Sequence, residues 1–171
     1  MKKYLYIIGT ILITGYLGCI NPFAPKLIRS LESSDLIITP QRTPQEVLQN
    51  FKVAYTFRDS LLYSDLLDTA FLFIYYDFYE GTSGQYVSWG RDIDLMTTGR
   101  LFRHFDVIEL VWNETLYESK TEENGDLGKS FNLTLIGQEG DFKLSGRAMF
   151  SFRKCPDEKW RITRWKDESD V

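Results

Sequence analysis

Residues 70–79 read Ala-Phe-Leu-Phe-Ile-Tyr-Tyr-Asp-Phe-Tyr, and at this point the spacing of apolar residues changes from helical to alternating. Aromatic and β-branched side chains occupy both sets of alternating positions, which is typical of a β-strand covered on both faces. Phe71, Phe73, Tyr75 and Asp77 share one of these faces. The stretch therefore predicts the first strand of a sheet over residues 70–79.

The residues before this strand carry two helix signals. Thr43 is suited to cap a helix, Pro44 to occupy its first position and Glu46 to complete a capping box. Apolar residues then recur at helical spacing to about residue 58. A second, shorter helix is predicted over residues 59–68.

The residues after the first strand predict further β-structure interrupted by one helix. A brief returning strand is expected at 85–88 and a third helix at 89–104. Further strands with alternating apolar residues are predicted over residues 107–118, 131–135, 142–153 and 160–165. Helices first and antiparallel hairpins afterwards indicate the α+β class, with N-terminal helices packed on a curved, mostly antiparallel sheet.

The N-terminus resembles the precursor of a bacterial lipoprotein. A basic start at residues 1–3 precedes an apolar stretch at 4–18, and Cys19 follows directly after Gly18. The resemblance implies that residues 1–18 are removed and that Cys19 is acylated and held by membrane lipid. Two alternatives stay open: an ordinary Cys19 behind a conventionally cleaved signal, and an uncleaved anchor over residues 4–20. Each places the rest of the chain outside the cytoplasm, in the periplasm or at the cell surface.

The segment 19–42 is interpreted as a tether. It contains three of the five prolines of the chain, Pro22, Pro25 and Pro40, and proline favours extended backbone. The folded domain is then expected over residues 43–168.

The order of these elements resembles the nuclear transport factor 2-like superfamily, which includes ketosteroid isomerases and SnoaL-like cyclases. The resemblance is carried by the 43–46 helix start, the Trp-Gly-Arg-Asp entry at 89–92 and the closing Trp-Arg-Ile strand at 160–162. It implies a sheet that wraps a long helix into a cone-like, cystatin-like roll, often with a pocket at the open end. Members of this superfamily range from enzymes to lipid binders and dimerisation modules, so the fold alone does not assign a function.

Such a pocket is expected to be lined mainly by aromatic side chains. The pocket residues expected from alternation are Tyr55, Tyr63, Tyr75, Trp112, Trp160 and Arg164. Arg164 either pairs with Asp77 inside the pocket or extends to solvent at the sheet edge, with Asp77 ending its strand. For an isomerase-like enzyme, Asp77 with Tyr55 or Tyr63 is the nominated catalytic set. His104 is interpreted as a helix-end or surface residue.

Composition and charge exclude several classes of function. The net charge of −4 and the pI near 5.1 argue against nucleic-acid binding. Two cysteines and one histidine offer no metal cluster, and no cofactor motif is present.

The outer face of the sheet is expected to hold Val111, Tyr117, Met149 and Trp165. Scattered surface residues and a homodimer interface are the two interpretations of this set.

Together these patterns predict a lipid-anchored extracytoplasmic protein. Its domain is expected to bind a small apolar molecule or a protein, without catalysis. A lyase or isomerase that acts in the pocket is the alternative.

Overall fold

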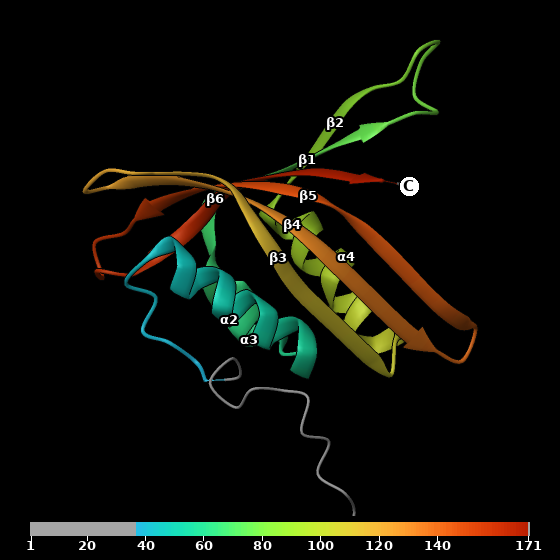
Figure 1. Ribbon diagram of the computed structural model, residues 1–171, viewed down its shortest axis with the longest axis horizontal. Helices are drawn as coiled ribbons and strands as arrows, with labels where there is room; N and C mark the ends of the chain where they lie inside the picture. Colours follow the sequence, from blue (N-terminus) through green and yellow to red (C-terminus); the bar gives the residue numbers. More distant parts are fainter. Residues whose placement is uncertain (1–36, 171) are drawn as a thin grey trace, which may run out of the picture. The chain divides into compact units, whose positions relative to one another are not determined.

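A six-stranded sheet in the order β2-β1-β6-β5-β4-β3 is the frame of the computed structural model, which describes residues 37–170. Three helices cover one face of this sheet (Figure 1). The elements are α2 (Pro44–Phe57), α3 (Ser60–Leu66), β1 (Leu67–Asp77), β2 (Gln85–Gly90), α4 (Arg91–His104), β3 (Val107–Lys120), β4 (Asn124–Gly137), β5 (Gly140–Lys154) and β6 (Trp160–Asp170). The predicted α+β class, with N-terminal helices on a curved and mostly antiparallel sheet, is confirmed. The predicted signal, Cys19 and most of the tether lie outside the described residues.

The sheet is mixed because β1 runs parallel to β6, while every other neighbouring pair is antiparallel. Since β6 lies between β1 and β5, the last strand of the chain joins the early hairpin to the later meander. The β1–β2 hairpin extends beyond the other strands at one end (Figure 1).

Several element boundaries differ from the prediction. Trp89 and Gly90 belong to β2, and the third helix begins only at Arg91. β4 begins at Asn124, well before the predicted start at residue 131, since pairing with both β3 and β5 supports polar residues there. β6 continues to Asp170, five residues beyond its predicted end.

Helix α2 forms as its sequence indicates. The Thr43 hydroxyl accepts a hydrogen bond from the backbone N–H of Glu46 at 3.2 Å, and the Glu46 carboxylate accepts one from the N–H of Arg42 at 2.7 Å. The helix ends at Arg58, which adopts the left-handed conformation with φ of 56°. The predicted cap by Thr43 is therefore confirmed, whereas Glu46 accepts from the residue before the cap and not from the N–H of Thr43 itself.

Phe51 on α2 joins the helices to the concave face of the sheet. Its ring lies 4.6 Å from that of Tyr55 and 5.4 Å from that of Tyr63. It also lies 5.8 Å from the Trp112 ring and 5.4 Å from the Trp165 ring. Such edge and stacked contacts add to the free energy of burying the rings. The early helix is thus held by strands from the second half of the chain.

A β-bulge at Thr163 reverses the faces of β6. Ile162 pairs with Phe152 and Arg164 with Ser151, so Thr163 has no partner on β5. An extra residue shifts the alternation of every later side chain by one position. Arg164 consequently lies on the outer face, where it donates to the Ser151 hydroxyl at 2.9 Å. The expectation that Arg164 shares the face of Trp160 and lines a pocket is wrong for this reason.

The same bulge turns Trp165 inward, so its predicted place on the outer face is also wrong. The Trp165 ring packs 4.8 Å from Phe73 and 5.5 Å from Phe150. Val111 and Tyr117 are exposed as expected, at 38% and 52%. The outer apolar set is therefore smaller than predicted, and the homodimer stays a prediction.

No helix among residues 37–170 is both long and apolar enough to cross a membrane.

Truncating Phe51 tests its role in holding the fold together. We expect Phe51→Ala to lower the free energy of unfolding by about 3–5 kcal/mol, because it removes a ring that is 1% exposed. The measurement is urea unfolding followed by circular dichroism. Phe57→Ala, at a position of the same helix that is 60% exposed, is the matched control and should change stability by at most about 0.5 kcal/mol. Equal losses in the two variants would contradict the assignment.

Candidate functional site

A small cavity of about 150 Å³ lies between α2, α4 and the concave face of the sheet. Its lining is mostly aromatic and aliphatic, and only three of its residues carry a polar side-chain group other than an indole: Tyr55, Asp167 and Ser169. The apolar lining consists of Phe51, Phe73, Leu101, Leu110, Trp112, Phe131, Leu133, Leu144, Ala148 and Trp165. A concave, mostly apolar site with few polar groups is typical of small-molecule binding.

Asp167 is the ionisable carboxyl group of this cavity. Its Oδ2 accepts a hydrogen bond from the Ser169 hydroxyl at 2.9 Å. Its Oδ1 is buried and has no hydrogen-bond partner among the described residues. Burial raises the pKa of Asp167 above its ordinary value of 3.8, although hydrogen bonds from Ser169 oppose this shift. The cavity thus holds a carboxyl group with an unused acceptor atom.

Trp165 contributes an unused donor to the same cavity. Its indole Nε1 is buried and has no partner within the described part of the chain. Buried polar groups in proteins are almost always hydrogen-bonded, so an unpartnered donor and an unpartnered acceptor in one cavity point to a bound polar group.

A polar network adjoins the cavity at Tyr55, whose ring lies 5.8 Å from that of Tyr63. The Tyr63 hydroxyl donates to Oδ2 of Asp94 at 2.7 Å, and the Trp89 indole donates to Oδ1 at 3.1 Å. Burial raises the pKa of Asp94, and it also raises that of Tyr63. Both carboxylate oxygens of Asp94 are satisfied, and neither Asp94 nor Tyr63 lines the cavity. This network joins α3, β2 and α4 and is structural.

The predicted pocket residues divide between several places. Tyr55 and Trp112 line the cavity, as expected. Tyr63 lies in the buried network, and Trp160 is buried at the far end of β6, next to the Lys120 side chain. Burial raises the pKa of Tyr55 above its ordinary range, and the negative charges of Asp94 and Asp167 add to this.

The remaining nominated residues are Tyr75, Asp77 and His104. Tyr75 and Asp77 line a second, larger hollow beside the β1–β2 hairpin. Asp77 does not pair with Arg164, and its Oδ1 instead accepts from the N–H of Tyr79 at 2.9 Å, closing the turn after β1. His104 is exposed at the end of α4, 3.7 Å from a carboxylate oxygen of Glu139. The structure therefore does not bring Asp77 together with Tyr55 or Tyr63.

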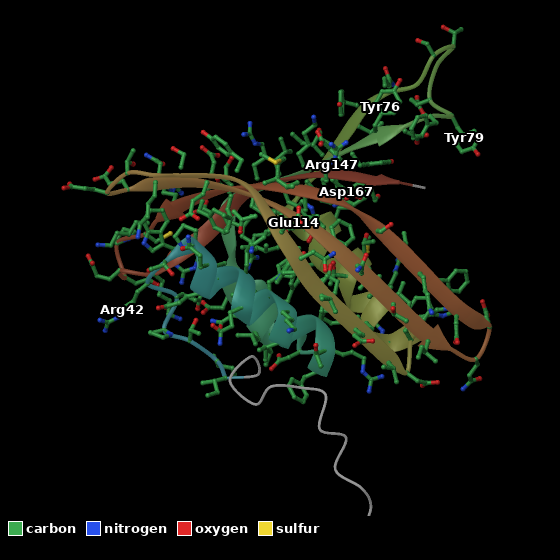
Figure 2. The ribbon with its side chains drawn as sticks, in the orientation of Figure 1. Arg42, Tyr76, Tyr79, Glu114, Arg147 and Asp167 are labelled. Atoms are coloured by element: carbon green, nitrogen blue, oxygen red, sulfur yellow. The ribbon has the colours of Figure 1, made fainter. Side chains whose placement is uncertain are left out.

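The second hollow has a volume of about 680 Å³ and shares Phe73, Asp167 and Ser169 with the cavity. We call it the hairpin groove. Figure 2 shows Tyr76 and Tyr79 on the hairpin, with Arg147 and Asp167 on the strands beside its base. Asp167 thus lies where the two hollows meet.

Sequence reasoning missed Asp167 and Asp94. Asp167 belongs to the acidic run at 167–170, a composition that indicates a solvated chain end. Alternation from Trp165 places Asp167 on the inner face only once the bulge is known. Asp94 follows Ile93 in an ordinary amphipathic helix, so no local pattern distinguishes it.

No group of three or more His, Cys, Asp or Glu side chains within residues 37–170 is arranged to hold a metal ion.

Comparison with known proteins identifies the fold only. No protein-family model and no curated protein matches the chain. A conserved protein from Planctomyces limnophilus is similar in structure, with a TM-score of 0.63 at 16% identity over 74% of this chain and 92% of that one. A candidate scytalone dehydratase from Novosphingobium aromaticivorans has a TM-score of 0.62 at 12% identity, over 74% and 81% of the two chains.

A candidate dehydratase of the nuclear transport factor 2-like family from Streptomyces avermitilis has a TM-score of 0.58 at 17% identity, over 73% and 91% of the chains. These similarities support a nuclear transport factor 2-like fold, as the sequence suggested.

The pH dependence of stability tests the environment of Asp167. Because burial raises its pKa in the folded state, ionising Asp167 costs more there than in the unfolded chain, and the stability present below the unfolded pKa is lost as the pH rises through the folded pKa. We expect Asp167→Asn, which cannot ionise, to be more stable than the parent above that pH and similar to it near pH 3.

Urea unfolding of both proteins across this pH range is the measurement. Glu114→Gln, at an exposed position of β3, is the control and should show a stability difference that does not change with pH in this way (Figure 2). If the stability difference of Asp167→Asn depended on pH no more than that of this control, the raised pKa of Asp167 would be ruled out.

Proposed function

We propose that this protein binds a small, mostly apolar molecule in the cavity, anchored outside the cytoplasm through Cys19. The observation that carries the binding proposal is that one apolar cavity contains both an acceptor, Asp167 Oδ1, and a donor, Trp165 Nε1. Neither atom has a hydrogen-bond partner among residues 37–170. A single hydroxyl group donates one hydrogen bond and accepts another. A hydroxyl group on an apolar ring therefore offers the donor that Asp167 Oδ1 lacks and the acceptor that Trp165 Nε1 lacks.

The size of the cavity limits the buried part of the ligand. A cavity of about 150 Å³ lined by apolar side chains is suited to a group of the size of benzene. Larger ligands would extend past Asp167 into the hairpin groove, because the two hollows share that residue.

A lyase or isomerase is the second candidate. A carboxyl group with a raised pKa is suited to general acid–base catalysis, and two of the structurally similar proteins are candidate dehydratases. In that case Asp167 would transfer the proton, and turnover would disappear in Asp167→Asn. Binding without catalysis is preferred because the tyrosine–carboxylate hydrogen bond that residues 37–170 form near the cavity, from Tyr63 to Asp94, involves no residue of the cavity lining.

Phenol can donate a hydrogen bond and anisole cannot, so the two probes test whether the cavity accepts one. We expect phenol to bind about fivefold to tenfold more tightly than anisole, since one hydrogen bond contributes about 1 kcal/mol. Isothermal titration calorimetry is the measurement. Leu144→Phe, which adds volume to the cavity lining, should weaken both ligands, whereas Leu116→Phe at a position 46% exposed on β3 should weaken neither.

Equal affinities for phenol and anisole in the parent protein would contradict the role of Asp167. Binding that Leu144→Phe leaves unchanged would place the probe outside the cavity.

The anchor is tested by mass spectrometry of the protein purified from its native membrane. We expect an N-terminal peptide that begins at Cys19 and carries acyl chains, because the Gly18-Cys19 junction resembles a lipoprotein cleavage site. Cys155, the other cysteine, is the internal control and should carry no lipid. An unmodified Cys19 on a secreted, soluble species would overturn the anchor.

A further inference from the structure

We propose that the hairpin groove binds an organic cation of the alkylammonium type. This site goes beyond the cavity ligand proposed above, although Asp167 contributes to both hollows.

The groove exists because two paired strands separate. β1 and β6 stay in register from Leu72, opposite Arg164, to Ile74, opposite Lys166. The next positions, Tyr75 and Asp167, are not paired, and both line the groove. The divergence of the hairpin from β6 is visible in Figure 1. A hollow of about 680 Å³ falls within the size range of small-molecule sites.

One wall of the groove is aromatic. The Phe73 and Trp89 rings are stacked with their centroids 4.6 Å apart, and the Tyr75 ring lies 5.1 Å from that of Trp89. The faces of tyrosine and tryptophan rings attract cations through their quadrupole. This wall is therefore suited to a positively charged group that also has apolar surface.

The charges in the groove favour the same kind of ligand. Glu168 is compensated, because its carboxylate lies 2.8 Å from the Lys166 ammonium and 4.0 Å from the Arg147 guanidinium. Asp77 and Asp167 have no salt-bridge partner among the described residues. Three carboxylates against two cations, Lys166 and Arg147, leave one net negative charge at the groove. The Asp167 Oδ1 atom also has no hydrogen-bond partner among residues 37–170.

At the rim of the groove, the cation of Lys166 already lies over an aromatic ring. The Lys166 ammonium lies 4.7 Å from the centroid of the Tyr86 ring, and Tyr86 lines the groove. An anionic ligand would face the charges of Asp77 and Asp167, and a neutral ligand would leave them uncompensated. An alkylammonium group uses both the rings and the carboxylates.

Choline and its neutral isostere 3,3-dimethylbutan-1-ol test the proposal directly. The two probes have nearly the same shape and differ in charge. We expect choline to bind the purified protein at least about tenfold more tightly than the isostere, as measured by isothermal titration calorimetry.

Four variants locate the site. Asp167→Asn and Tyr75→Leu are each expected to weaken choline binding about tenfold, whereas Tyr75→Phe keeps the ring and should retain it. Glu114→Gln removes one negative charge on β3, which β4 and β5 separate from β6, and should leave the affinity unchanged. Circular dichroism establishes that each variant is folded.

Choline binding to a cavity variant distinguishes a ligand in the groove from a ligand in the cavity. Leu144→Phe, which adds volume to the cavity, is expected to leave choline binding unchanged. The proposal is overturned if choline does not bind, if its neutral isostere binds equally well, or if Leu144→Phe abolishes binding while Tyr75→Leu does not.

Discussion

The packing of Phe51 against the concave face is the interaction on which the rest of the structure depends. Its ring contacts residues of α2, α3, β3, β5 and β6, so elements from both halves of the chain meet at one side chain. An isolated helix of the length of α2 is marginally stable in water, so α2 depends on burying its apolar face against the sheet. The cavity lies beside this contact, and Phe51 and several of the rings that it touches form part of the cavity lining.

The bulge at Thr163 decides what those walls contain. One additional residue places Trp165, Asp167 and Ser169 towards the helices and Arg164 and Lys166 towards the outer face. Without it, a cationic Arg164 would face the apolar interior, where an unpaired charge is costly. The bulge therefore determines both the charge of the interior and the position of Asp167 Oδ1, which has no hydrogen-bond partner in the described part of the chain.

Asp167 then connects two environments that differ in character. On one side it borders a small apolar cavity, and on the other a wider groove with aromatic and acidic side chains. The Tyr63–Asp94–Trp89 network nearby is also polar and buried, but its hydrogen bonds are complete. In contrast, Asp167 Oδ1 and Trp165 Nε1 have no hydrogen-bond partner within residues 37–170, which is why the binding proposal rests on them and not on this network.

Sequence patterns alone determined the helices, most strands and the α+β class, because the periodicity of apolar residues and the capping box are local properties. Two of the residues predicted for the pocket, Tyr55 and Trp112, line the cavity. Only the tertiary structure decided the faces of β6, the roles of Asp94 and Asp167, and the separation of Tyr75 from the cavity. These depend on pairing with β1 and β5, since a single unpaired residue exchanges the two faces of a strand while leaving its local sequence pattern unaltered.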